Sequence, residues 1–137
     1  MTHVLEEKTI NKIMIAEDDQ SILFEIEGGE SIVAKCDADC CSHTWIEHVE
    51  LPVNGFPAKV QSLGHVELNS NLDTRDGELQ FYGFKISTDK GDIIIDFRNE
   101  SNGYYGGSLV WPDDYFYGGV FGSQAQSEVW KEINSDQ

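Results

Sequence analysis

The sequence has few basic residues, few cysteines and no long apolar run. Nine lysines and arginines stand against 25 aspartates and glutamates in 137 residues, so the formal net charge is −16. A surface this acidic repels nucleic acid and anionic lipid, so we expect no direct nucleic-acid contact. No apolar stretch approaches the roughly 18 residues of a membrane-spanning helix. Residues 1–12 also lack an apolar signal-peptide segment, and we expect a cytoplasmic protein without membrane contact.

The few cysteines lie close together, and they limit the chemistry that the chain offers. Cys36, Cys40 and Cys41 share one short segment with His43. An odd count with two adjacent cysteines makes a poor disulfide framework, and thiols stay reduced in the cytosol. These four side chains are possible zinc ligands, but the segment has no Cys-x-x-Cys spacing. We therefore expect no metal and no other cofactor, and keep the four only as weak metal candidates.

An enzyme that uses the cysteine segment is an alternative. A Cys41 thiolate at the start of a helix would have a lowered pKa, and a nearby histidine could act as its base. The adjacent acids oppose this, because negative charge raises the pKa of a thiol. The sequence contains no signature of a known cysteine enzyme, so we expect no catalytic residue.

Alternating apolar and polar residues predict that most of the chain is β-strand. The expected strands are Thr9–Ala16, Ser21–Glu27, Ser31–Cys36, Ala58–Asn69, Leu79–Thr88, Asp92–Arg98 and Ser108–Trp111. Gly28-Gly29 and Asp89-Lys90-Gly91 predict tight hairpin turns. The expected core residues are Ile22, Phe24, Ile26, Trp45, Phe81, Phe84, Ile93 and Ile95.

Two helices complete the expected fold. Thr44-Trp45-Ile46-Glu47 matches the S/T-x-x-E capping box, which predicts a short helix from about Thr44. The apolar residues of Gln124 to Asn134 predict a weak C-terminal helix. We therefore expect an α+β fold, mainly an antiparallel sheet of about seven strands. Residues 1–137 form a single domain in this prediction, with a β-rich core over 1–111 and an aromatic, glycine-rich extension over 112–137.

Two aromatic segments are candidate binding surfaces. One is a glycine-rich loop with two tyrosines, which offer rigid amphipathic surface for recognition. Its candidate contact residues are Asn102, Tyr104, Tyr105 and Ser108. The other is the C-terminal extension, with Tyr115, Phe116 and Tyr117. These three could pack on the sheet, help to form a ligand pocket or build a homodimer interface.

Three strings in the chain are distinctive: Asp39-Cys40-Cys41-Ser42-His43-Thr44-Trp45-Ile46-Glu47, the turn Thr88-Asp89-Lys90-Gly91, and Ser101-Asn102-Gly103-Tyr104-Tyr105-Gly106-Gly107-Ser108-Leu109. Together they resemble a family of short uncharacterised proteins from bacteriophages and bacteria, known as a domain of unknown function. The resemblance covers about residues 5–111. It implies a phage or prophage origin and a small β-rich domain, and it implies no activity.

These observations lead us to expect a small, non-catalytic binding protein of phage type. A charge of −16 on a small body roughly imitates a phosphate array. The most specific hypothesis is a counter-defence inhibitor, similar to an anti-CRISPR protein, that occupies a basic nucleic-acid-binding surface of a host protein. Its candidate acidic face contains Glu17, Asp18, Asp19, Asp113 and Asp114. The alternative is a protein that binds or sequesters a small ligand with the Asn102 to Ser108 loop and the aromatic extension, and simple solubility also explains the charge.

Overall fold

The computed structural model describes residues 3–38, 43–66, 72–74, 77–101, 107–112 and 129–133. They form ten strands: β1 Thr9–Ala16, β2 Ser21–Ile26, β3 Ser31–Ala38, β4 His43–Glu50, β5 Ala58–Val66, β6 Leu72–Thr74, β7 Gly77–Thr88, β8 Gly91–Ser101, β9 Gly107–Val110 and β10 Trp130–Glu132. All the strand pairs are antiparallel. These residues include no helix, and so none that is long and apolar enough to cross a membrane. The fold is therefore all-β, and the α+β prediction is wrong.

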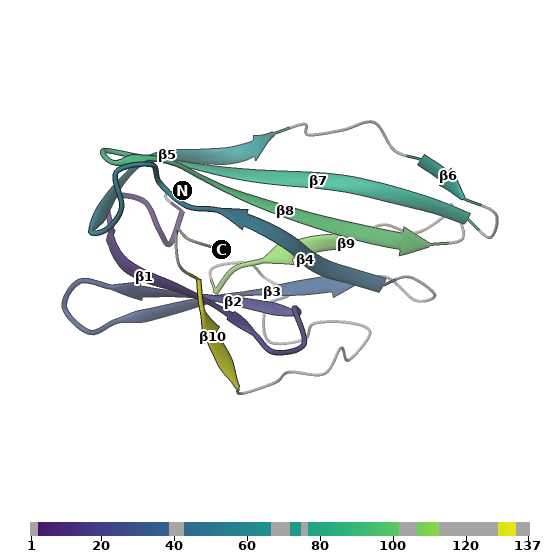
Figure 1. Ribbon diagram of the computed structural model, residues 1–137, viewed down its shortest axis with the longest axis horizontal. Helices are drawn as coiled ribbons and strands as arrows, with labels where there is room; N and C mark the ends of the chain where they lie inside the picture. The colour runs from purple at the N-terminus through teal and green to yellow at the C-terminus, as the bar shows by residue number, and fades with distance from the viewer. Residues whose placement is uncertain are drawn as a thin grey trace.

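The strands follow one path that bends into two layers (Figure 1). The order along the path is β4-β8-β7-β5-β1-β2-β3-β9, with β10 beside β1 and β6 beside β7. Strand β5 joins the layers, because its first residues pair with β1 and the rest of the strand pairs with β7. In Figure 1, β4, β5, β7 and β8 lie above β1, β2 and β3.

The hydrophobic core lies between these layers. Six of the predicted core residues are buried, namely Ile22, Phe24, Ile26, Phe84, Ile93 and Ile95. Trp111, just after β9, packs between the layers, with its ring centroid 5.5 Å from that of Phe24 and 5.2 Å from that of Phe84. The period-two pattern therefore predicted the inward face of β2 correctly.

The segment after the cysteines is strand β4, so the helix predicted from Thr44 is wrong. Thr44, Ile46 and Val49 are buried, and a bulge between residues 46 and 48 shifts the alternation. All three are β-branched, which suits a strand. The Thr44 hydroxyl accepts a hydrogen bond of 2.8 Å from Asn99 Nδ2 on β8, instead of capping a helix. Pairing with β8 thus overrides the local capping signal.

The predicted C-terminal helix is also wrong where the structure describes it. Residues 130–132 form β10, which pairs with residues 14–16 of β1. Two flanking bonds extend this pairing: Glu17 N donates to Val129 O at 2.8 Å, and Ile133 N donates to Ile13 O at 3.1 Å. Strand β5 pairs only with Thr9 and Ile10 of β1, so the rest of that edge needs backbone partners, which β10 supplies. Strand β6 likewise lies in a segment for which the sequence analysis expected no strand.

Candidate binding surfaces

The outer face of β4, β8 and β7 carries a row of large side chains. Trp45 pairs in register with Arg98, and Arg98 pairs with Phe81 on the next strand. Trp45 and Phe81 were predicted in the core, but both are only half-buried. Trp45 follows a buried threonine on an alternating strand, so it points outward, and Phe81 lies opposite the inward face of β7. We call Trp45, Phe81, Arg98, His43, Glu47 and Asp96 the outer-face cluster.

Two carboxylates and an aromatic ring hold Arg98 in this cluster. Its Nη2 and Nε lie 3.3 and 3.4 Å from the two Asp96 carboxylate oxygens. Its Nη1 lies 3.7 Å from Glu47 Oε1, and its Cζ lies 4.8 Å from the ring centroid of Phe81. The Arg98 side chain is 26% exposed. This geometry fixes a planar cation at the surface, which suits guanidinium better than ammonium.

Glu47 connects Arg98 to Trp45. The indole Nε1 of Trp45 donates a hydrogen bond of 2.8 Å to Glu47 Oε2, while the other carboxylate oxygen faces Arg98. His43 stacks on Trp45, with ring centroids 5.5 Å apart and an angle of 20° between the planes. The polar end of the indole is thus satisfied within the protein. Trp45 is therefore held ready for contact, and tryptophan and arginine are enriched among the residues that dominate binding energy.

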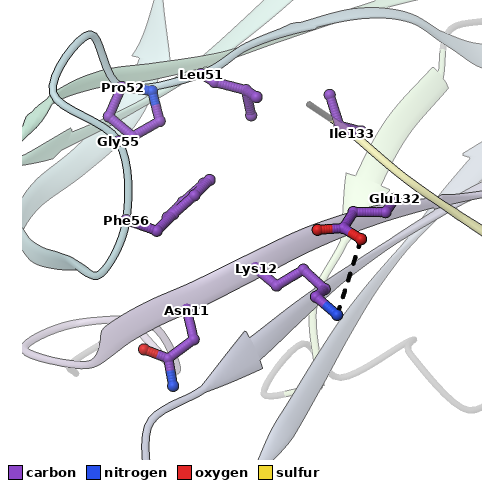
Figure 2. Close-up of a pocket in the computed structure, with 8 residues that line it drawn as sticks. All are labelled: Asn11, Lys12, Leu51, Pro52, Gly55, Phe56, Glu132 and Ile133. Atoms are coloured by element: carbon purple, nitrogen blue, oxygen red, sulfur yellow. Dashed lines mark ion pairs between the residues drawn. The ribbon is translucent and has the colours of Figure 1, made fainter. Parts of the chain in front are cut away.

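A groove lies beside β4, at the end of the strand path. One cavity of about 220 Å³ is lined by residues 47–49 of β4, Ile15 of β1 and residues 131–133. A second cavity of about 220 Å³ is lined by Asn11, Lys12, Leu51, Pro52, Gly55, Phe56, Glu132 and Ile133 (Figure 2). Glu132 and Ile133 line both cavities. We call the two together the β4–β10 groove.

The second cavity has an apolar side and a polar side. In Figure 2, Leu51, Phe56 and Ile133 surround its upper part, whereas Lys12 and Glu132 face each other below. Lys12 Nζ lies 3.9 Å from Glu132 Oε2 and also 3.9 Å from Glu25 Oε2. A space of this size accepts a large side chain or a small molecule with an apolar body.

The three predicted acids of the β1–β2 turn have different surroundings. Glu17 is exposed. Asp18 Oδ1 accepts a bond of 3.1 Å from the Gln20 backbone N–H, which stabilises the turn. Asp19 has φ of 59°, its carbonyl accepts a bond from Ile46 N at 2.9 Å, and its Oδ1 lies 3.9 Å from Lys131 Nζ. Asp18 and Asp19 therefore help to position the turn as well as adding charge.

Most of the other predicted site residues lie outside the described part of the chain: Cys40, Cys41, Asn102, Tyr104, Tyr105, Asp113, Asp114, Tyr115, Phe116 and Tyr117. Ser108 lies in β9, where its backbone pairs with Asp37 of β3. Cys36 is buried in the core, and His43 is the exposed residue that stacks on Trp45. Within the described ranges, no group of three or more metal-binding side chains occurs.

The sequence prediction missed Arg98 and Phe81 as surface residues and placed Trp45 on a helix. Their proximity depends on the register of β4 on β8 and of β8 on β7, which no local pattern gives. One signal was available: Asp96 and Arg98 alternate with the apolar residues of β8, which places both on the outer face.

The sequence matches the domain of unknown function DUF7448 over residues 5–111. The chain belongs to this family. The match confirms the expected relation to an uncharacterised domain family, and it contains the whole outer-face cluster. Strand β10, one wall of the groove, lies beyond the matched residues. Neither the curated proteins nor the solved structures provided a match.

Proposed function

We propose that this DUF7448 protein is a non-catalytic binding protein that occupies a basic surface of a partner protein. The observation that carries the proposal is the half-buried row of Trp45, Arg98 and Phe81 across three strands. Neighbouring carboxylates fix Trp45 and Arg98, and the Arg98 guanidinium lies over the ring of Phe81. Aromatic residues and arginine are enriched in protein interfaces, and a preorganised contact loses less side-chain entropy on binding.

The charge around the row favours a basic partner. Glu47 and Asp96 are 42% and 21% exposed, and exposed Glu100 pairs with His43 at the edge of the cluster. With a net charge of −16 on the whole chain, lysine and arginine side chains are attracted to this face. A partner arginine could also stack on the exposed part of Trp45.

The finer proposal is a phage-type counter-defence inhibitor, similar to an anti-CRISPR protein. In this proposal the partner is a host protein, and the occupied surface is its nucleic-acid-binding groove. The acidity and the distinctive sequence strings support it, and exposed Glu17 would add to the acidic face. The inhibitor would act in the host cytoplasm, where cysteine thiols stay reduced.

The test is capture of host proteins on the immobilised protein, compared with the variants Trp45→Ala and Val53→Ala. Val53 is 86% exposed in the β4–β5 loop, outside the outer-face cluster, so it controls for loss of an exposed apolar side chain. We expect a basic nucleic-acid-binding protein that Trp45→Ala loses and Val53→Ala retains. Added DNA and high salt should both release it, because exposed charges are screened over about 8 Å at physiological ionic strength. Capture that is indifferent to DNA, salt and Trp45→Ala would refute the proposal.

A further inference from the structure

Strand β4 ends the strand path, so the edge along its residues 47–50 that lies away from β8 has no neighbour in the order of the described strands. Within the described residues, these four pair with no strand other than β8. The bond on this edge, from Ile46 N to Asp19 O, lies just before them. Strand β10 likewise pairs with β1 alone in the part of the chain that is described. Among the described residues, the backbone groups of each strand on the side away from its partner therefore have no strand to pair with.

Residues of both strands line the β4–β10 groove. Residues 47–49 and 131–133 line the first cavity together with Ile15 of β1. An extended peptide can add to an exposed strand edge through backbone hydrogen bonds, while its side chains set specificity. A gap with a strand on either side offers such a peptide two edges instead of one.

The side chains of the groove select the kind of peptide. Ile15 and Ile133 are half-buried and pack against the core, and Val49 is buried. The carboxylates of Glu47 and Glu132 are more open, with side chains 42% and 47% exposed. Successive side chains of a strand point to opposite faces. A segment that alternates apolar and basic residues would thus place its apolar side chains on the two isoleucines and the valine. Its basic side chains would lie near the carboxylates of Glu47 and Glu132.

The basic residues of the groove do not oppose a basic segment. Lys12 lies 3.9 Å from both Glu25 and Glu132. Lys131 lies 3.9 Å from Asp19. Lys12 therefore has Glu25 as a partner besides Glu132, Lys131 has Asp19, and the net charge of −16 on the chain favours a cationic ligand.

We infer that the β4–β10 groove binds an extended segment of alternating apolar and basic residues, which adds as a strand between β4 and β10. Glu47 makes the groove continuous with the outer-face cluster, because it bonds Trp45 and lines the first cavity. The cavity of Figure 2 takes one large apolar side chain of the segment, between Leu51, Phe56 and Ile133. The inference rests on the proposed function only in taking the basic partner as the source of this segment.

A synthetic peptide of about seven alternating valines and arginines, the length of an ordinary strand, is the direct probe. Binding is measured by fluorescence anisotropy, and backbone protection by amide hydrogen exchange. We expect binding, with slowed exchange at residues 47–50 and 131–133. N-methylation of the peptide backbone should weaken binding at least about tenfold, because it removes the hydrogen-bond donors. A valine–glutamate peptide should not bind.

Ile133→Trp provides the blocking variant, because Ile133 lines both cavities, and Val53→Trp is its control. We expect peptide affinity to fall at least about tenfold for Ile133→Trp and to stay unchanged for the control. If Ile133→Trp fails to fold, Glu132→Gln, at a side chain 47% exposed, replaces it and should also weaken binding. Any of three results would overturn the inference. The peptide does not bind, it binds without protecting these amides, or its affinity does not change with N-methylation or in the blocking variant that folds.

Two assays separate this inference from the proposed function. Protection of the groove amides by the peptide tests the inference, and capture of a basic protein that depends on Trp45 tests the proposed function. If the peptide protects the groove but no basic protein is captured, the groove inference stands and the proposed function fails. If a partner is captured through Trp45 but the peptide leaves the groove amides unprotected, the groove inference fails alone.

Discussion

The buried hydrogen bond between Thr44 and Asn99 gives a quantitative test of the strand that replaced the predicted helix. Both residues are fully buried, and Asn99 Nδ2 donates to the Thr44 hydroxyl at 2.8 Å. Thr44→Val keeps the shape but removes the acceptor, which leaves a buried amide without this partner. We expect a loss of about 1–3 kcal/mol in the free energy of unfolding. Asn99→Leu should cost less, because it also removes Asn99 Oδ1, for which the described residues offer no partner.

The double variant Thr44→Val/Asn99→Leu completes the cycle. Because it removes both partners, the double variant should lose about 1 kcal/mol less free energy of unfolding than the two single variants lose together. Urea unfolding monitored by circular dichroism measures each variant, with the denaturant slope checked for constancy. A control cycle pairs Thr44→Val with Ile26→Val, at the β2–β3 hairpin, and should be additive. If the Thr44 and Asn99 effects are simply additive, the register of β4 on β8 is wrong.

Three further predictions concern the core, the surface charge and the buried thiol. Phe24→Ala should lower the free energy of unfolding by about 3–5 kcal/mol, because the ring is fully buried; in urea unfolding, a loss close to that of Val53→Ala would contradict the packing. Glu17→Gln should slow association with the captured partner more than it speeds dissociation, since exposed charge acts mainly on encounter; surface plasmon resonance distinguishes the two rates. In a Cys40→Ser/Cys41→Ser variant, which leaves Cys36 as the one cysteine, the thiol should react with Ellman's reagent only after unfolding, and rapid reaction of the folded variant would contradict its burial.

The strands with one buried face could be predicted well from the sequence. The alternating pattern predicted both ends of the strand Thr9–Ala16 correctly. It also predicted the inward residues of β2, because these residues all pack into one core. Gly28 and Gly29 both have φ of 97°, so the glycine pair correctly marked the hairpin after β2. These features depend on local spacing, which is why they are visible without a structure.

Long-range pairing decides the elements that were predicted wrongly. The capping-box pattern at Thr44 is a weak local preference, whereas the strand pairs along β8 and buries Ile46 and Val49. Strand β10 exists because β1 has an edge that β5 leaves open, a fact about topology that residues 124–134 cannot reveal. The outer-face cluster was missed for the same reason, since its members come from three strands.

The affinity of the captured partner for Trp45→Ala, measured beside Val53→Ala, tests the proposed function most directly. Trp45 is half-buried on the outer face and lies outside the core, so its removal should leave the fold intact. We predict that Trp45→Ala raises the dissociation constant at least about tenfold, mainly through a faster dissociation rate, and that Val53→Ala does not. Equal affinities for the two variants, with thermal unfolding unchanged, would contradict the assignment of the outer-face cluster as the binding surface.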